Sequence, residues 1–214
     1  MQRQEPTTEL TADGDRGPAL DQSRLRATLR LCFAPEQADS LASLVTWEAR
    51  TEAEALRPVI RAARIDFASE RLSSPFRRRR RMTQGERPLA PRFGLASDAA
   101  LALALHLGLG LEIETLAALL GRSEHEISLA LYEARQANEP AELEPCTEFV
   151  AAIGRSRNPA DERTAERLAF LQHVATCSRC RPTLEATRAL DDRLIGQIET
   201  YARSLPVMPK PDHR

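Results

Sequence analysis

The sequence predicts an all-α protein built from three small helical modules. Aromatic residues make up only 4% of the 214 residues, whereas 42% are hydrophobic. The cores must therefore consist of Leu, Ala, Ile and Val, and a chain rich in Ala, Leu, Arg and Glu favours helix over strand. Segments with helical spacing of apolar residues alternate with Pro- and Gly-containing linkers. We expect a first module over 20–82, a linker over 83–96, a second module over 97–138 and a third over 142–205, with disordered ends at 1–19 and 206–214.

The first module is predicted to contain three helices. The segment "SRLRATLRLCF" has apolar residues at helical spacing, and a second helix begins at Pro35 and continues through "PEQADSLASLVTWEAR" to Arg50. The third helix, "LRPVIRAARIDFASERL", is amphipathic. Its apolar face holds Val59, Ile60, Ala63 and Phe67, and its basic face holds Arg57, Arg61 and Arg64.

The second module has the pattern of a helix-turn-helix. Ser97 is the expected N-cap of "DAALALALHLGL", and a short helix, "EIETLAALLG", ends at Gly121. Ser123 and Glu126 form a capping box before the next apolar-periodic segment. Two short helices joined by a Gly-containing turn are typical of this motif. Of its histidines, His106 is expected in the core or at its rim and His125 in a turn.

The third module is predicted to contain a short helix in "CTEFVAAIG" and two longer ones. Asn158 and Pro159 have the positions of an N-cap and a first helical residue, and Pro182 marks the start of the last helix. No internal repeat is visible in the chain.

Cysteine and histidine spacing in the third module predicts a zinc site. His173 and Cys177 are four residues apart and share one helix face, and Cys180 completes a C-x-x-C pair at the turn into the next helix. Cys146 would complete a tetrahedral Cys₃His ligand set. Such a set leaves no coordination position open for a substrate, which is typical of a structural zinc ion. The alternative is a surface histidine with two ordinary buried cysteines. Cys32 is expected to be a plain core residue.

Charge is distributed unevenly although the net charge is only −1. The segment from Arg57 to Arg92 contains eleven arginines and three acidic residues. The segment from Asp98 to Glu148 contains ten acidic residues and two arginines. The first segment predicts a nucleic-acid or other acidic partner, or docking onto the second segment. Solvated surfaces of opposite sign are the alternative.

Neither a signal peptide nor a membrane segment is predicted. The N-terminal residues lack an apolar stretch, and the longest apolar run, Ala100 to Leu111, is too short to span a bilayer. We therefore expect a cytoplasmic protein, in which clustered thiols bind metal more often than they form disulfides. An enzyme is not expected, because the chain shows no Gly-rich phosphate loop and no Ser-His-Asp arrangement.

From Cys146 to Tyr201 the sequence resembles the zinc-binding anti-sigma domain. The shared pattern is a cysteine, a gap of 26 residues, and then H-x-x-x-C-x-x-C. This resemblance implies a small helical module that binds one zinc ion through Cys146, His173, Cys177 and Cys180 and inhibits a bacterial sigma factor. The ion would be structural or sensitive to oxidation.

The two upstream modules resemble extracytoplasmic-function sigma factors of RNA polymerase. The segment "PEQADSLASLVTWEA" matches the core of sigma region 2, with Asp39 and Trp47 at matching places. The segment "LEIETLAALLGRSEHEISLALYEAR" matches region 4, including its turn, Leu119 to Ser123, and its closing Ala134 and Arg135. The resemblance implies that region 2 melts the −10 promoter element and that region 4 reads the −35 element.

Several positions depart from the sigma pattern. Ser128, Ala130 and Glu133 stand where the recognition helix of the family is basic, and an acidic helix is repelled by the major groove. In the region 2 segment, Val59 and Ile65 replace the usual Trp and Asn.

A basic strip remains, and it is the predicted contact with promoter phosphates; a solvated charge run is the alternative. It comprises Arg57, Arg61, Arg64, Arg71, Arg77, Arg78, Arg79, Arg80 and Arg81.

Two functions follow from the resemblance. In the first, the protein binds RNA polymerase core and promoter DNA for transcription initiation, and its zinc module docks on the sigma-like modules and gates them in cis. In the second, it is a regulatory, anti-sigma-like interaction module that does not bind DNA and holds a sigma factor or a polymerase subunit.

Overall fold

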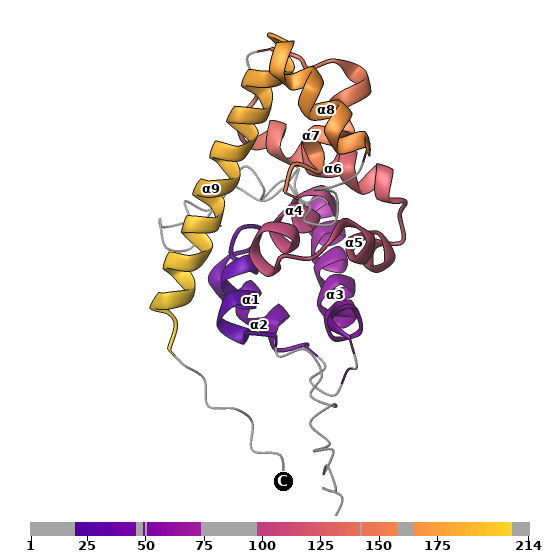
Figure 1. Cartoon of the computed structure of the whole chain (residues 1–214). Coiled ribbons are helices and arrows are strands. Elements are labelled where there is room, and N and C mark those ends of the chain that lie inside the picture. Colours follow the sequence, from indigo (N-terminus) through magenta and orange to yellow (C-terminus); the bar gives the residue numbers. More distant parts are fainter. Residues whose placement is uncertain are drawn as a thin grey trace, which may run out of the picture.

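The computed structural model describes residues 20–45, 49, 51–73, 98–141, 143–157 and 165–206, with only the backbone described for 66–73. These residues form nine α-helices and one 3-10 helix without any strand, so the predicted all-helical class is confirmed for the described part of the chain. Figure 1 shows that the long helix α9 runs along the molecule from α8 at one end to α1 and α2 at the other.

The N-terminal helices are α1 (Gln22–Leu29), α2 (Pro35–Ala42) and α3 (Glu52–Ser73). The Asp21 carboxylate caps α1 by accepting hydrogen bonds from the amides of Ser23 and Arg24. Helix α2 is shorter than predicted, because the chain turns at Ser43, whose hydroxyl donates to the carbonyl of Ser40.

Helix α3 has the amphipathic character that the sequence predicts. Val59, Ile60 and Ala63 are buried, whereas Arg57 and Arg61 are exposed. The side chain of Phe67 lies outside the described residues.

Helix α4 (Asp98–Leu109) occupies the centre of the fold. Every residue from Ala100 to Gly108 is buried, as expected of a helix that is apolar on all sides. It contacts α1, α6 and α9. Its approach to α1 is so close that a Cβ atom on Gly108 would lie 2.1 Å from the Thr28 hydroxyl oxygen.

Helices α5 (Ile113–Leu120) and α6 (Glu124–Asn138) form the predicted helix-turn-helix. Gly121 ends α5 with a φ of 65°, a left-handed conformation that glycine adopts without strain. The predicted capping box is confirmed: the Ser123 hydroxyl accepts from the Glu126 amide, and the Glu126 carboxylate accepts from the Ser123 amide. The predicted cap Ser97 lies outside the described residues.

The C-terminal part contains η2 (Thr147–Phe149), α7 (Val150–Gly154), α8 (Ala165–Thr176) and α9 (Cys180–Ser204). Asn158 and Pro159 lie outside the described residues. Helix α9 begins two residues before Pro182, which is tolerated in the first turn because its missing N–H is not needed there.

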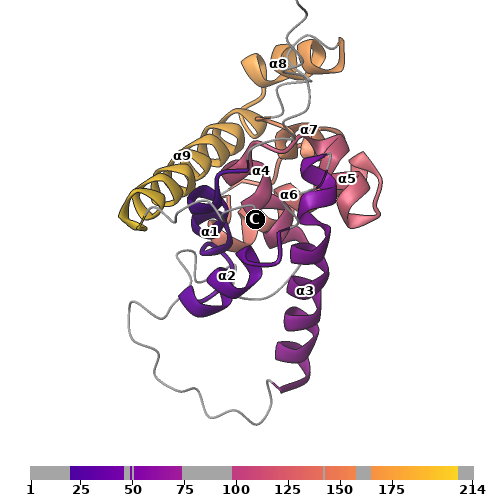
Figure 2. The same ribbon diagram turned by 90° about the horizontal axis from the view of Figure 1, so that it is seen from below.

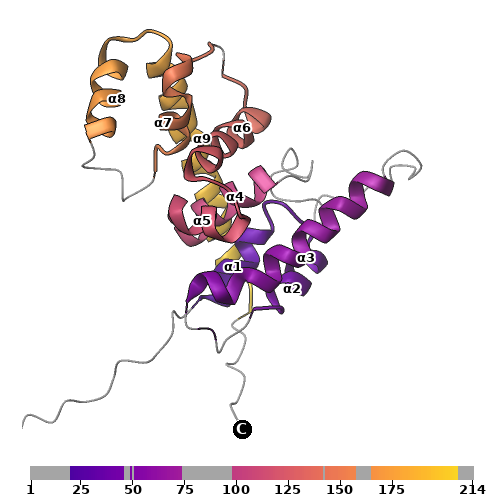
Figure 3. The same cartoon turned by 90° about the vertical axis from the view of Figure 1, so that its right-hand side faces the viewer.

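Two hydrophobic cores hold the described helices together. The larger core joins residues of α1 to α6 with Leu190, Leu194 and Ile198 from the second half of α9. The smaller core contains Ile153, Phe170 and Leu184. Figures 2 and 3 show α8 standing apart from α1 to α5, so the smaller core forms one end of the molecule.

Candidate metal centre

The four predicted zinc ligands come from three separate parts of the C-terminal segment. Cys146 precedes η2, His173 lies in the last turn of α8, and Cys180 is the first residue of α9. Cys177 lies in the turn between these two helices, and its amide donates to the carbonyl of His173 at 2.9 Å. Local helix geometry therefore places the histidine and both cysteines on one side of the turn.

The geometry of the cluster fits a tetrahedral metal ion. One candidate ligand atom from each residue lies within 4.8 Å of the others. The Sγ atoms of Cys146 and Cys177 are 3.8 Å apart. In a tetrahedral zinc site with Zn–S bonds of about 2.3 Å, two sulfur atoms are separated by about 3.8 Å. The structure thus brings together the predicted ligands in a cluster that can hold a metal ion, and the set of donors is consistent with zinc.

His173 provides a second indication of a metal ion. Its Nε2 atom is buried without a hydrogen-bond partner, although buried polar atoms are normally satisfied. The imidazole ring is held by stacking on Phe149, with ring centroids 4.1 Å apart. Coordination of a metal would satisfy a histidine nitrogen at this buried position.

The surroundings of the sulfur atoms favour a thiolate at Cys177 and disfavour one at Cys180. Donation from the backbone amides of Cys180 and Arg179 lowers the pKa of Cys177 to about 6. Burial raises the pKa of the Cys180 thiol to about 11, and the neighbouring Cys177 contributes in the same direction. The Arg179 guanidinium donates to the sulfur of Cys146 at 3.2 Å. A bound cation would stabilise the deprotonated form of all three sulfurs.

Cys32 lies outside this cluster. It is buried in the larger core, as predicted, and burial raises the pKa of its thiol to about 12. It therefore behaves as a small apolar residue.

The predicted DNA-contacting arginines differ in their surroundings. Arg57 and Arg61 are exposed on α3. Arg64 forms two hydrogen bonds with the Asp98 carboxylate, at 2.8 and 3.0 Å, and one with the carbonyl of Leu120. This pairing lowers the pKa of Asp98. Arg64 thus joins α3 to α4 and α5, while the side chain of Arg71 and the residues Arg77, Arg78, Arg79, Arg80 and Arg81 lie outside the described residues.

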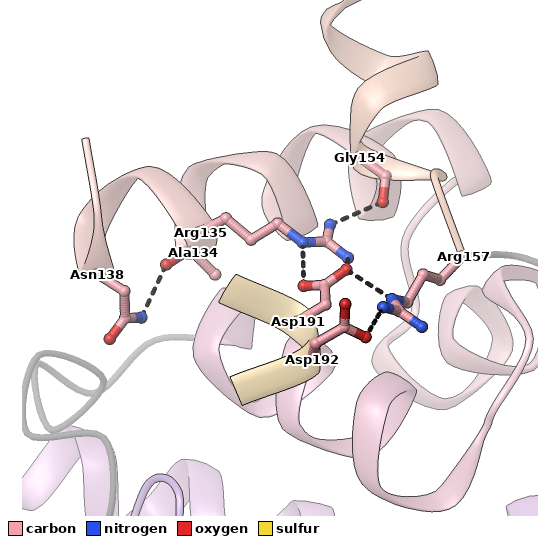
Figure 4. Close-up of polar contacts among 7 residues, drawn as sticks. All are labelled: Ala134, Arg135, Asn138, Gly154, Arg157, Asp191 and Asp192. Carbon is pink, nitrogen blue, oxygen red and sulfur yellow. Dashed lines mark hydrogen bonds and ion pairs between the residues drawn. The ribbon is translucent and has the colours of Figure 1, made fainter. Parts of the chain in front are cut away.

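Sequence reasoning missed a buried ion pair between α6 and α9. Arg135 and Asp191 are 1% and 0% exposed and form two hydrogen bonds, at 2.8 and 2.9 Å (Figure 4). Asp191 stands next to Leu190 and three residues before Leu194, within the apolar stripe of α9. An acidic residue inside such a stripe is the signal that could have revealed a buried partner.

Searches of protein-family models, of curated proteins and of solved structures return no match to this sequence. None of the described helices combines the length and apolar character needed to cross a bilayer.

Proposed function

We propose that this protein is a bacterial transcription regulator whose sigma-factor-like helices bind RNA polymerase and promoter DNA and are gated in cis by its zinc-binding C-terminal segment. The proposal rests on the sequence resemblance and on the contacts between these parts of the chain. Helix α7 packs on α6, and α9 packs on α1 and α4.

The packing of α7 on α6 carries the gating part of the proposal. A Cβ atom on Gly154 would lie 1.9 Å from the carbonyl oxygen of Ser128, so α7 lies directly against α6. Of the three positions at which the sigma recognition helix is basic, Ser128 and Ala130 are buried and Glu133 is exposed. A recognition helix must present its base-contacting residues to the major groove. In the observed conformation, α7 therefore covers α6 at Ser128 and keeps this position from reaching DNA, whereas Glu133 is exposed.

The N-terminal helices keep a surface for phosphates. Arg57 and Arg61 are four residues apart, exposed, and on the same face of α3. Their guanidinium groups can each contact a phosphate of the DNA backbone. Such contacts supply affinity and position without sequence specificity. Promoter choice would therefore depend on release of α7 from α6 or on the polymerase.

One observation favours the second function, a regulator that binds protein instead of DNA. Glu124, Glu126 and Glu133 are exposed on α6, and acidic side chains are repelled by phosphates. An acidic helix face suits a basic protein surface, such as one on a sigma factor or a polymerase subunit.

DNA binding as a function of salt concentration separates the two functions. Binding of the full chain to duplex DNA would be measured by fluorescence anisotropy between 50 and 200 mM salt, concentrations chosen because phosphate contacts weaken steeply in this range. For the first function, we expect salt-dependent binding, and replacing both Arg57 and Arg61 by Ala should reduce the salt slope by about 2. Replacing the exposed Arg188 and Arg203 of α9 by Ala is the control with the same change in charge.

Absence of binding to DNA at low salt, with or without core polymerase, would contradict the first function. Co-purification with core polymerase or a sigma factor in that case would support the second.

A further inference from the structure

A cluster of four charged side chains joins α7 to α6 and α9. It comprises Arg135, Arg157, Asp191 and Asp192, and is called the ion-pair cluster below (Figure 4). Besides its two bonds with Asp191, the Arg135 guanidinium donates to the carbonyl of Gly154, the last residue of α7, at 2.8 Å. One guanidinium therefore connects three helices.

Arg157 attaches the chain that follows α7 to the same carboxylate. Its Nε atom lies 3.3 Å from the second oxygen of Asp191, without the alignment of a hydrogen bond. Its Nη2 atom pairs with Asp192, which is 69% exposed. The buried carboxylate of Asp191 thus balances the positive charges of both Arg135 and Arg157. The exposed carboxylate of Asp192 balances only the charge of Arg157.

Other contacts between the C-terminal segment and α6 are also ionic. Arg155 pairs with Glu124 at 3.7 Å, and Arg193 pairs with Glu139 next to the end of α6. The apolar part of this contact is small, because the smaller core has three fully buried side chains and receives only the half-buried Tyr132 from α6. By contrast, α9 contributes Leu190, Leu194 and Ile198 to the larger core.

We propose that Asp191 is the positioning residue that fastens α7 onto α6, and that breaking the ion-pair cluster releases α7 while α9 stays packed on α1 and α4. Separating α7 from α6 exposes the ion-pair cluster, and water solvates the charges that become exposed. A buried ion pair adds little net stability over an apolar pair of the same volume, but it fixes one geometry and is costly to leave half made. Loss of Asp191 should therefore cost more than loss of an exposed carboxylate, because it leaves two arginines without their buried partner. A regulatory role for the release of α7 from α6 rests on the proposed function. The release itself can be measured whether or not that function is correct.

Hydrogen–deuterium exchange of the zinc-loaded full chain tests this assignment. Asp191→Asn keeps the shape of the side chain but leaves two arginines without a buried counter-charge. We expect amide exchange in 150–157 to accelerate on the order of a hundredfold, with unchanged protection of α1 and α4 and an unchanged zinc content. Asp192→Asn, the same substitution one residue later, is the matched comparison: it removes only the exposed pair with Arg157 and should accelerate exchange in 150–157 far less than Asp191→Asn.

Arg157→Gln keeps the test decisive if Asp191→Asn unfolds the whole chain, because it leaves the Arg135–Asp191 pair intact. Its exchange in 150–157 should exceed that of Asp192→Asn by roughly tenfold, with α1 and α4 still protected. The assignment is overturned if neither variant accelerates exchange in 150–157 selectively.

DNA or polymerase binding by Asp191→Asn separates this inference from the proposed function. Selective opening with stronger binding supports both. Selective opening without any change in binding supports the role of Asp191 and contradicts gating by α7.

Discussion

Cys177 and Cys180 supply two of the four sulfur and nitrogen atoms at the candidate metal centre, and replacing both by Ser should abolish tight zinc binding. A hydroxyl group at neutral pH does not replace a thiolate as a zinc ligand, and two remaining ligands cannot close a tetrahedral site. We expect one zinc ion per chain in the wild type and less than about a tenth of that in the double variant. The measurement is metal content by mass spectrometry after dialysis under reducing conditions.

Cys32→Ala is the matched control for this experiment. Cys32 is buried away from the cluster, so its variant should keep the full zinc content. A reduced wild type without zinc, or a double variant that retains it, would contradict the metal centre.

His106 makes the stability of the fold depend on pH. Its Nδ1 atom lies 2.8 Å from the carbonyl oxygen of Leu111, and burial lowers the pKa of the ring. The unfolded chain then binds a proton more readily than the folded one, so this contribution to stability is complete above about pH 6.5 and is lost as the pH falls below it. The free energy of unfolding should drop there by up to about 1.4 kcal/mol per pH unit.

Urea unfolding of the wild type and of His106→Asn between pH 5 and pH 7.5 would isolate this contribution. The asparagine amide can still donate to the carbonyl of Leu111 but does not titrate. The two proteins should therefore diverge most in pH dependence below about pH 6.5. Parallel pH curves would show that His106 does not titrate differently in the folded and unfolded states.

At the scale of the helices, the contact between α1 and α4 depends on the absence of a side chain at Gly108. A methyl group there would overlap the Cβ and Oγ1 atoms of Thr28, which is fully buried and donates to the carbonyl of Arg24. Gly108→Ala should lower the free energy of unfolding by about 1–3 kcal/mol, since neither helix can move without repacking the larger core.

Gly196→Ala is the control for this prediction. Gly196 lies in α9, and a Cβ atom there would meet no neighbouring group within 4 Å. Alanine should therefore raise the free energy of unfolding by about 0.5–1 kcal/mol through helix propensity alone. Urea unfolding measures both changes, and a Gly108→Ala protein as stable as the wild type would show that the two helices can separate at low cost.

Local sequence signals predicted the helices and the clustering of the four candidate metal ligands well. The capping box at Ser123 and the glycine at 121 set the ends of α5 and α6 through backbone chemistry that acts within a few residues. The histidine-to-cysteine spacing likewise follows from helix geometry. The sequence did not show that Arg135 and Asp191 pair, because that pairing depends on how α9 crosses α6, which is decided by packing between segments 56 residues apart. The pairing of Arg64 with Asp98 was missed for a related reason: the two residues lie 34 positions apart in the chain.

At the scale of the whole molecule, the two cores differ greatly in size. The larger core includes residues from α1 to α6 and α9, whereas the smaller core has only Ile153, Phe170 and Leu184 fully buried. Helix α8 buries a single residue, Phe170. Small regions with so few buried side chains are usually stabilised by a metal ion or another crosslink.

Removing zinc with a chelator should therefore unfold one end of the molecule and leave the rest folded. Structural zinc stabilises small isolated modules by about 10 kcal/mol or more, because ligands that lie far apart in the unfolded chain are held together only by the ion. In hydrogen–deuterium exchange, α7, α8 and the first turns of α9 should lose protection, while α1, α4 and the second half of α9 should keep it. The Cys177→Ser, Cys180→Ser double variant is the control, since it should already exchange rapidly at this end and should not respond to chelator. Loss of protection in α1 and α4 together with α8 would show that the ion stabilises the entire fold, and full protection of α8 without zinc would show that the smaller core is sufficient by itself.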